Sequence, residues 1–507
     1  MTEVLTWAII GLLPVIVGFK WLRVAQREHY IAGWTTRIAL GWGRSRQTSW
    51  WPLFAAVALE FLSSFIPTAS WSIPIPLVVF GLVAVWPWGL RFRGTTSPLQ
   101  WTARLQRLAF FWLVLSWLFL FAASTLSVSY AVVLFGFLAP AVMDLALVIT
   151  RPIEKALSSK WLVAAQKKLR QVKPTVVAIT GSYGKTSTKG YVAHLLVAKY
   201  SVVPSPASFN NLMGLARAVN DKLTPGTEVF VAEMGMYGEG EIRELSKSFP
   251  PDIAAITTIG EAHLERVGSR DAILRAKSEI VENARTVVLP IDDPKLAALA
   301  KRCESEGKRV IRVSATGAKA DVSVNPAKGT VTVGAESAPV QISGIGHAVN
   351  VAVAVGIAHA LDVPLATLAP RLGNLPTAAH RAEPQQAPNG AIIIDDSYNA
   401  NPIGAARAIE GGSAMAKGRK GKFIVVTPGM IELGPVQFER NSDLSAQVAK
   451  VKGELFVVGY TNRAALLAGH PTAQVFADRP SAMAAALERA GASGVILVEN
   501  DLPDHYA

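Results

Sequence analysis

A glycine-flanked turn between a predicted strand and a predicted helix is the segment of this chain best suited to chemistry. The β-branched run 176–180 leads into Gly181-Ser182-Tyr183-Gly184-Lys185-Thr186-Ser187 and a helix-compatible segment. In such a turn the backbone N–H groups face an anion, the lysine reaches terminal phosphates, and the threonine hydroxyl can hold Mg²⁺. The turn is shorter than the usual Walker pattern, but its place between strand and helix predicts an ATP-phosphate site. The expected phosphate contacts are Gly181, Ser182, Gly184, Lys185, Thr186 and Ser187.

Three further polar residues follow apolar runs in the same half of the chain. Glu233 ends the run 229–232, His263 follows the run 253–259, and Lys277 lies in a helical segment. Alone, each has an ordinary structural interpretation: a solvated strand end, a structural histidine and a surface lysine. The carboxyl ends of parallel strands meet at one sheet edge, which is where α/β proteins bind ligands. We therefore interpret Glu233 as a Mg²⁺ ligand and the three residues as one site.

The order of these motifs along the chain resembles the Mur ligases, over about residues 172–460. Within that superfamily the chain is most similar to the branch that adds D-alanyl-D-alanine to the UDP-MurNAc-tripeptide. The resemblance rests on Thr180 to Lys189, Ser208 to Asn211, Glu233 to Gly235, Gly240 to Ile242, Gly260 to Glu265, Lys277, Gly346-His347, Asn350, His380-Arg381 and Asp395 to Pro402.

The resemblance implies roles for individual residues. It implies a P-loop-type central Mur ligase domain that binds ATP, and a Rossmann-like C-terminal domain that closes on it. The implied magnesium ligands are Thr186, Glu233, His263 and Lys277, the last as a carbamylated lysine. The implied nucleotide contacts are His347, Asn350, Arg381, Asp396 and Asn399, and the implied catalytic residues are Lys185, Lys277, His263 and Asp396.

The same resemblance implies a reaction, the ATP-dependent joining of an acid to an amine through a C–N bond. A carboxylate is a poor electrophile, so it first takes the γ-phosphate and becomes an acyl phosphate. An amine then attacks and phosphate leaves. The protein positions both partners and neutralises developing charge, while lobe closure excludes water.

Strand-like runs alternate with helical ones through the second half of the chain. They lie at 175–180, 228–233, 252–258, 286–290 and 309–313, and again at 391–395, 422–427, 454–458 and 495–499. Such alternation indicates mostly parallel sheets with helices on both faces. We expect a central α/β domain at 174–378, with a β-hairpin appendage at 320–342, and a C-terminal α/β domain at 379–507.

The first 150 residues have a different composition. Twelve of the thirteen tryptophans precede residue 120, and five apolar runs lie at about 4–19, 50–67, 71–90, 108–126 and 128–150. Each run approaches the ~20 residues that a spanning helix needs. We predict a transmembrane domain of about five helices at 1–150 and an amphipathic linker helix at 151–173. Because Pro74 and Pro76 interrupt the third run, four spans plus a re-entrant piece is an alternative.

Charge patterning gives the expected orientation. The net charge is +13, and the basic residues of the first 150 positions cluster in the segments 20–49 and 91–107. Basic loops stay cytoplasmic, which places the N-terminus outside the inner (cytoplasmic) membrane and the catalytic domains inside. Anionic lipid accounts for this charge better than nucleic acid does. The single cysteine excludes a disulfide framework.

Two acids, Glu60 and Asp144, fall within apolar runs. An acid inside a membrane suggests a functional site by default, whereas the alternative is a residue near an interface or paired with another helix. We favour the second interpretation for both residues.

The membrane segment stands where the family's UDP-sugar-binding domain would be, and two C-terminal family motifs are altered at 439–441 and at 499–501. The favoured hypothesis is therefore a membrane-anchored ligase of peptidoglycan precursor metabolism. It would join a membrane-linked, carboxylate-bearing cell-wall precursor to an amino acid or dipeptide. One alternative keeps the addition of D-Ala-D-Ala to UDP-MurNAc-tripeptide, and another is a poly-γ-glutamate-type ligase. A hypothesis of another class is a non-catalytic, nucleotide-binding scaffold that organises a complex of cell-wall enzymes.

Overall fold

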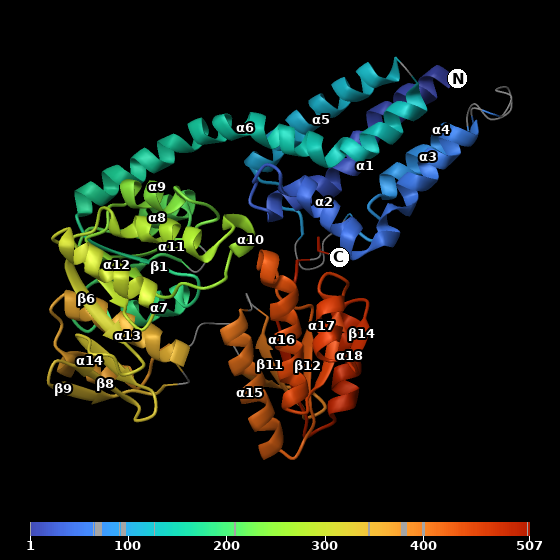
Figure 1. Ribbon diagram of the computed structural model, residues 1–507. Coiled ribbons are helices and arrows are strands. Elements are labelled where there is room, and N and C mark those ends of the chain that lie inside the picture. Colours follow the sequence, from blue (N-terminus) through green and yellow to red (C-terminus); the bar gives the residue numbers. More distant parts are fainter. Residues whose placement is uncertain are drawn as a thin grey trace.

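The computed structural model describes the whole chain except residues 1, 64, 66–73, 91, 93–97, 126, 207–208, 343–344, 377–382, 398–400, 504 and 507. The chain forms a helical domain, a central α/β domain and a C-terminal α/β domain. Figure 1 shows the long helix α6 passing from the helical domain over the central domain, with the C-terminal domain below the helical domain and beside the central one.

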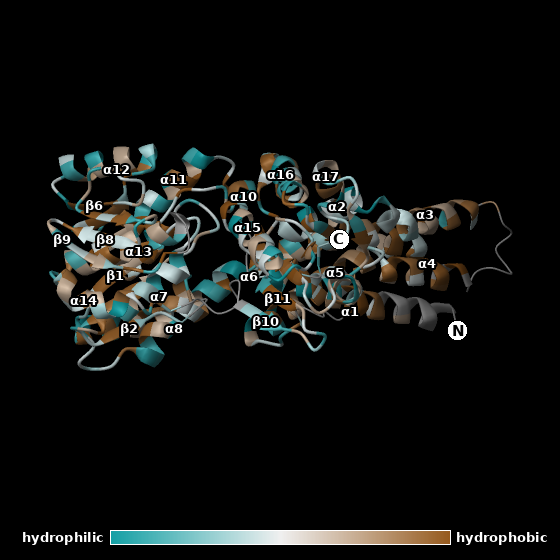
Figure 2. Ribbon diagram, turned by 90° about the horizontal axis from the view of Figure 1, so that it is seen from below, coloured by the Kyte–Doolittle hydropathy of each residue, from teal (hydrophilic) through white to brown (hydrophobic). Residues whose placement is uncertain are grey.

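The helical domain packs around buried aromatic side chains. Its elements are α1 (Thr2–Arg27), α2 (Trp34–Ser45), η1 (Gln47–Trp50), α3 (Trp51–Ser63), α4 (Pro74–Val85), α5 (Ala103–Ser124) and α6 (Val128–Val172). Trp21 and Trp112 are fully buried, and Trp42 and Trp86 nearly so. Figure 2 shows apolar residues dominating α3 and α4.

Two helices among the described residues are long and apolar enough to cross a membrane: α5, and the apolar part of α6. They correspond to the expected runs 108–126 and 128–150. By length and composition alone, a buried core helix would pass the same test. The helices in the second and third expected runs, α3 and α4, have 13 and 12 described residues. The part of these two runs at 64 and 66–73 lies outside the described residues.

The boundary between the helical and central domains differs from the expected linker. Residues 151–172 are not a separate helix, because α6 is continuous over 45 residues. Its second half packs on α8 (Leu212–Lys222), where the Lys168 Nζ donates to the Asn220 carbonyl at 2.7 Å and the Asn220 amide to the Trp161 carbonyl at 3.0 Å. A single helix therefore connects the two domains.

Asp144 has a structural role, as expected. Its carboxylate accepts hydrogen bonds from the backbone N–H of Thr36 at 3.0 Å and from the Thr36 hydroxyl at 2.6 Å, and it also contacts Thr35. These donors lie in the first turn of α2, whose N–H groups lack intrahelical partners. Asp144 on α6 therefore anchors α2, a helix that the sequence had suggested was a basic loop.

The central domain is a nine-stranded sheet in the order β2-β3-β1-β4-β5-β6-β7-β8-β9, parallel as far as β7. The strands are β1 (Thr175–Thr180), β2 (Val202–Pro204), β3 (Val229–Glu233), β4 (Ile253–Ile256), β5 (Thr286–Pro290), β6 (Arg309–Ser314), β7 (Val322–Asn325), β8 (Thr330–Val333) and β9 (Glu336–Pro339). The expected hairpin at 320–342 is present, but it extends the sheet beside β6.

Both faces of the central sheet are covered. The helices are α7 (Lys185–Leu196), α9 (Glu241–Ser248), α10 (Leu264–Val267), α11 (Arg270–Ser278), η2 (Glu279–Val281), α12 (Pro294–Ser305), α13 (Ile345–Ala360) and α14 (Leu365–Leu372), besides α8. Val177 and Ile179 of β1 face the core with α7 and α13, whereas Val176 and Ala178 face the core with α8. Because successive strand residues point to opposite faces, β1 lies in the middle of the domain and ends at the phosphate loop.

The C-terminal domain repeats this architecture with a six-stranded sheet in the order β10-β11-β15-β12-β13-β14. Its strands are β10 (Glu383–Gln386), β11 (Ile392–Asp396), β12 (Phe423–Thr427), β13 (Glu454–Val458), β14 (Gln474–Phe476) and β15 (Val495–Glu499). Its helices are α15 (Pro402–Gly418), η3 (Gly434–Val436), α16 (Gln437–Lys450), α17 (Arg463–Gly469) and α18 (Arg479–Ala490). The expected α/β class is thus found in both domains, with the short strands β2, β10 and β14 in addition.

Candidate nucleotide and metal site

The phosphate loop has the expected strand–turn–helix form. β1 ends at Thr180 and α7 begins at Lys185, so the N-terminus of α7 faces the turn. Gly184 has a φ of 80°, and a Cβ there would lie 2.1 Å from the Oδ1 of Asn350. Only glycine combines that conformation with that lack of space. Asn350 on α13 therefore lies against the loop, as a nucleotide contact would.

Side chains of the loop hold it against the segment that leads to His263. The backbone N–H of Gly260 donates to the Ser182 hydroxyl at 2.8 Å, and that of Glu261 donates to the Tyr183 hydroxyl at 3.1 Å. The Lys185 Nζ donates to the Gly181 carbonyl at 2.7 Å, within the turn. The loop and the 258–263 segment are therefore one connected structure.

Glu233 lies at the end of β3 and is 2 % exposed. Its carboxylate accepts the Thr186 hydroxyl at 3.0 and 3.1 Å and the Asn210 amide at 3.4 Å, and it pairs with the Lys189 ammonium at 2.9 Å. Carboxylate and hydroxyl oxygens are ligands that Mg²⁺ accepts. Glu233 and Thr186 therefore fit a magnesium site beside the phosphate loop.

Lys277 is almost fully buried, on α11. Burial, and secondarily the charge of Lys185, hold the pKa of its ammonium well below the usual range. A buried neutral amine is the form that can accept CO₂ and become an anionic ligand, so this environment fits a carbamylated lysine. The charges of Lys277 and Lys185 both contribute to lowering the pKa of His263.

His263 precedes the one-turn helix α10 and is only partly exposed. Its Nδ1 lies 2.7 Å from the Oε2 of Glu432, a residue of the C-terminal domain. Burial lowers the pKa of His263, while the Glu432 carboxylate raises it in part. For Glu432, burial opposes ionisation, but the His263 hydrogen bond and the Arg266 charge lower its pKa to about 2. The Nδ1 of His263 therefore donates to the Glu432 carboxylate.

The described residues bring most of the expected site together. Thr186 lies with Glu233 and Asn350 with Gly184, and the charges of Lys185 and Lys277 act on His263. His347 lies on α13 with its ring 5.4 Å from that of Tyr191, and Ser187 lies in the first turn of α7. Arg381 and Asn399 lie outside the described residues, as do Ser208, His380 and Tyr398.

Asp396 is placed in the other sheet, at the carboxyl end of β11, opposite Glu499 of β15. Glu499 is fully buried, and neither of its carboxylate oxygens has a hydrogen-bond partner in the part of the chain that the structure describes. Burial, and then the charge of Asp396, raise the pKa of Glu499 well above its usual value.

Sequence reasoning missed the contacts of three ionisable residues in the two α/β domains. Lys189 was seen only as part of a motif, although it lies four residues after Lys185 and so on the same helix face. Glu499 ends an apolar strand as Glu233 does, and the same signal could have found it. Glu432 lies in a Glu-Leu-Gly segment, 432–434, that resembles a C-terminal motif of the family, but its contact with His263, 169 residues away, had no local signal. Among the described residues no three His, Cys, Asp or Glu side chains lie together, so a metal here needs the hydroxyl of Thr186 or a modified Lys277.

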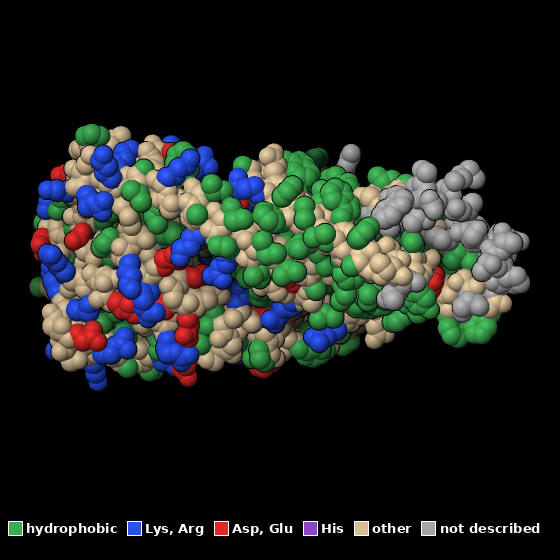
Figure 3. Space-filling view, turned by 90° about the horizontal axis from the view of Figure 1, so that it is seen from above, with side chains coloured by type: hydrophobic (Ala, Val, Ile, Leu, Met, Phe, Trp, Pro, Cys, Tyr) green, Lys and Arg blue, Asp and Glu red, His purple; other side chains and the backbone are tan. Residues whose placement is uncertain are grey.

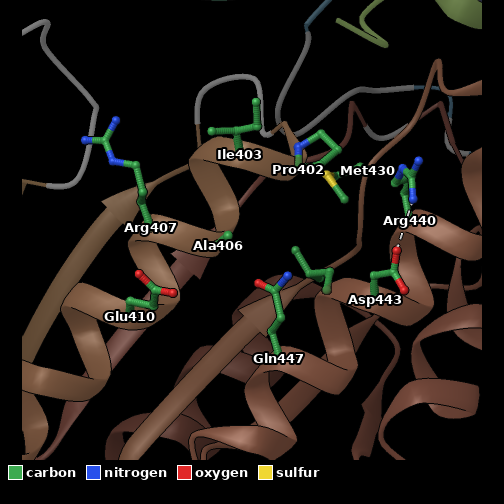
Figure 4. Close-up of a pocket in the computed structure, with 10 residues that line it drawn as sticks. Pro402, Ile403, Ala406, Arg407, Glu410, Met430, Arg440, Asp443 and Gln447 are labelled. Atoms are coloured by element: carbon green, nitrogen blue, oxygen red, sulfur yellow. Dashed lines mark hydrogen bonds and ion pairs between the residues drawn. The ribbon is translucent and has the colours of Figure 1, made fainter. Parts of the chain in front are cut away.

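A separate groove lies between α15 and α16 of the C-terminal domain, with a volume of about 520 Å³. Figure 4 shows Arg407 and Glu410 on one helix and Arg440, Asp443 and Gln447 on the other. Arg440 also pairs with Glu261 of the central domain through two hydrogen bonds of 2.8 and 2.9 Å. One end of the groove therefore adjoins the segment that holds the phosphate loop.

Two domain families match the chain. Residues 179–358 match the Mur ligase middle domain, and residues 380–499 match the glutamate ligase domain of Mur ligases. The UDP-N-acetylmuramoyl-tripeptide–D-alanyl-D-alanine ligase of Mycobacterium tuberculosis H37Rv is 34% identical over 242 residues, 45% of this chain and 46% of the relative. That of Bacillus subtilis is 30% identical over 297 residues, 57% of this chain and 63% of the relative.

Solved structures give the same result for the two α/β domains. MurF from Acinetobacter baumannii has a TM-score of 0.57 at 25% identity, over 67% of this chain and 77% of that one. MurF from Thermotoga maritima in complex with ADP has a TM-score of 0.55 at 26% identity, over 68% and 80%. The chain spans about half the length of the mycobacterial relatives it matches.

Proposed function

Because residues 179–358 and 380–499 belong to the Mur ligase family, we propose that the chain is an ATP-dependent amide ligase. It activates a carboxylate as an acyl phosphate, joins it to an amine, and releases ADP and phosphate. The observation that carries this proposal is that the phosphate loop, at the carboxyl end of β1, is bonded both to Glu233 of β3 through Thr186 and to the segment that leads to His263.

Each residue has a role in that reaction. Lys185 moves from the Gly181 carbonyl to the phosphates, while the N–H groups of Gly181, Ser182, Gly184 and Ser187 and the side chains of His347 and Asn350 bind ATP. Thr186, Glu233, His263 and carbamylated Lys277 would hold Mg²⁺, which when bound neutralises charge on the phosphates. Arg381, Asp396 and Asn399 would approach the nucleotide from the C-terminal domain.

The chain's own part in the chemistry is positioning and charge. A substrate carboxylate oxygen attacks the γ-phosphorus and ADP leaves, with Lys185 stabilising the developing negative charge. The amine then attacks the acyl carbon, and the C–O bond to phosphate breaks. Docking of the C-terminal domain through Glu432 and Arg440 helps to exclude water from the acyl phosphate.

We assign the helical domain to the inner membrane, with the catalytic domains in the cytoplasm and the N-terminus outside. Large apolar side chains are exposed on its helices, including Phe54 of α3, Phe110, Leu118 and Phe121 of α5, and Val148 of α6. Figure 3 shows hydrophobic side chains gathered over the helical domain and charged ones over the central domain. An apolar surface of this kind supports contact with lipid.

The substrate is then a membrane-linked carboxylate, such as a lipid-carried cell-wall precursor, joined to an amino acid or dipeptide. The groove between α15 and α16, with basic and acidic side chains on an apolar floor, suits a zwitterionic amine. A second candidate is addition of D-Ala-D-Ala to UDP-MurNAc-tripeptide, which the names of the relatives favour.

The test is phosphate release by the detergent-purified chain given Mg-ATP, D-Ala-D-Ala and either UDP-MurNAc-tripeptide or the same tripeptide on a lipid carrier. Products are identified by mass, and Lys185→Ala is the control. Turnover with the lipid-linked substrate alone supports the main proposal, and turnover with the UDP-linked substrate alone supports the second candidate. Nucleotide binding without product from either pair contradicts both.

A further inference from the structure

The one-turn helix α10 lies where all three domains meet. Two residues at this junction, His263 and Glu432, both have a φ of 64°, a left-handed conformation that costs non-glycine residues energy. The backbones also meet: the Glu265 N–H donates to the Glu432 carbonyl at 3.0 Å, and a Cβ on Gly434 would lie 3.1 Å from the Glu265 Cα. The loop after β12 is therefore fixed closely against α10.

Glu432 uses both carboxylate oxygens at this junction. One lies 2.7 Å from the Nδ1 of His263, and the other accepts the Nε and Nη2 of Arg266 at 3.0 and 2.8 Å. A histidine that ligates a metal usually donates its other ring nitrogen to a carboxylate, which fixes the tautomer and the ring orientation. With Nδ1 directed at Glu432, the Nε2 of His263 is the nitrogen left for a metal.

Arg266 continues the chain of ion pairs into the helical domain. Its guanidinium is 4% exposed, lies over the Trp34 ring at 3.8 Å, and donates to the Oε2 of Glu28 at 2.8 Å. Glu28 is in turn bound by His505 at 2.9 Å. Removing one member of a buried ion pair leaves the other uncompensated, which is strongly destabilising. The position of Glu432 therefore depends on Glu28, in a domain that makes no part of the phosphate loop.

We propose that Glu432 is a positioning residue that orients His263 for Mg²⁺, and that Arg266 and Glu28 hold it in place. The inference rests on the proposed function, because that function makes His263 a metal ligand. It gives the helical domain a second role, since binding of metal-nucleotide in the central domain requires that the helical and C-terminal domains are both docked on α10.

The test measures Mn²⁺ binding to the full detergent-purified chain with ADP by electron paramagnetic resonance. Electron spin-echo modulation from the histidine nitrogen reports direct coordination. Glu432→Gln keeps the shape of the side chain but removes its charge, and we expect about a tenfold loss of Mn²⁺ affinity and a weaker nitrogen signal. Glu28→Gln should weaken Mn²⁺ binding in the same direction, by less.

Glu265→Gln is the matched control. Glu265 lies on the same one-turn helix and pairs with Arg37 of the helical domain at 2.8 Å, but its side chain makes no contact with Glu432 among the described interactions. Its loss should leave Mn²⁺ affinity unchanged. An equal loss in Glu265→Gln would overturn the proposal, because any interdomain pair would then have the same effect.

Two other results would also overturn the proposal. One is unchanged Mn²⁺ affinity in both Glu432→Gln and Glu28→Gln. The other is a wild-type chain without a nitrogen signal, which would remove His263 as a ligand while leaving the ligase assignment to the phosphate-release assay. If Glu432→Gln does not fold by circular dichroism, Glu28→Gln against Glu265→Gln decides the question by itself.

Discussion

The two α/β domains each end a central strand with a buried glutamate, and the two glutamates have opposite surroundings. Glu233 in the central sheet is paired with Lys189 and bonded by Thr186 and Asn210. Glu499 in the C-terminal sheet is equally buried, but it has no hydrogen-bond partner among the described residues and faces Asp396. Burial and the Asp396 charge raise the pKa of Glu499, whereas Glu233 lies beside a lysine. The comparison teaches that charged partners, rather than the fold, distinguish the two carboxyl groups.

The largest effect on activity is expected when the charge of Glu233 is removed. Glu233→Gln should lower phosphate release by ~100-fold or more, since it removes preorganised charge beside the phosphates. Glu499→Gln, the matched change at the other edge, should stay within a few-fold of the wild type. Initial rates of phosphate release at saturating Mg-ATP measure both variants. Equal losses of rate would contradict the expected difference between the two glutamates.

Removing Lys189, the ion-pair partner of Glu233, should lower the stability of the folded chain. Lys189→Met leaves Glu233 buried without its counter-charge, and we expect a loss of ~3 kcal/mol in the free energy of unfolding. Lys199→Met, at an exposed lysine of the same domain that donates to the Asp362 carbonyl and lies over the Tyr200 ring, should change stability little. Urea denaturation followed by circular dichroism measures both variants. A stable Lys189→Met protein would show that Glu233 does not need its partner.

The pH dependence of stability should distinguish the two glutamates. The pKa of Glu499 is raised in the folded chain, so the folded state keeps a proton that the unfolded state loses as the pH rises above about 4.5. Stability therefore falls from that pH upward to the folded pKa. Glu499→Gln removes this loss and should stabilise the chain at pH 7 to 8 by ~1 kcal/mol, with no gain at pH 4. Thermal melts at the two pH values measure the difference, and a gain of equal size at both would contradict the account.

The smallest effect should come from the neighbouring charge. Asp396→Asn removes the repulsion that adds to burial, so the folded-state pKa of Glu499 should fall, and the pH dependence due to Glu499 should end at a lower pH but remain. Melts of Asp396→Asn and of Asp396→Asn with Glu499→Gln, from pH 4 to 9, isolate the shift. Disappearance of the pH dependence in the single variant would make Asp396, not burial, the dominant cause.

Features that depend on nearby residues could be predicted from the sequence. The strand before the phosphate loop, the loop itself and the start of α7 follow from β-branched residues, glycines and a Lys-Thr pair within 12 residues. The two mostly parallel sheets follow from the alternation of strand-like and helical runs. The buried side chains of Val177 and Ile179 confirm the expected central strand β1.

Helix ends and interdomain contacts could not be predicted. α4 begins at Pro74 and ends at Val85, before the Trp86-Pro87 pair. The helical conformation is disfavoured for a residue that precedes proline, so the helix ends before Trp86, although the apolar run continues to residue 90. α2 depends on Asp144, 109 residues away. The His263–Glu432 contact requires two domains to be docked, and no local pattern encodes the docking.

The central claim is that an acyl phosphate forms at the central edge, and an isotope test is its most direct measurement. The substrate carboxylate is labelled with ¹⁸O, and the phosphate released with Mg-ATP and amine is analysed by mass spectrometry. If the carboxylate attacks the γ-phosphorus and the amine later breaks the acyl C–O bond, one ¹⁸O passes into phosphate with each amide formed. The account predicts that transfer, and its loss in Lys185→Ala. Amide formation with unlabelled phosphate, or phosphate release without amide, would contradict it.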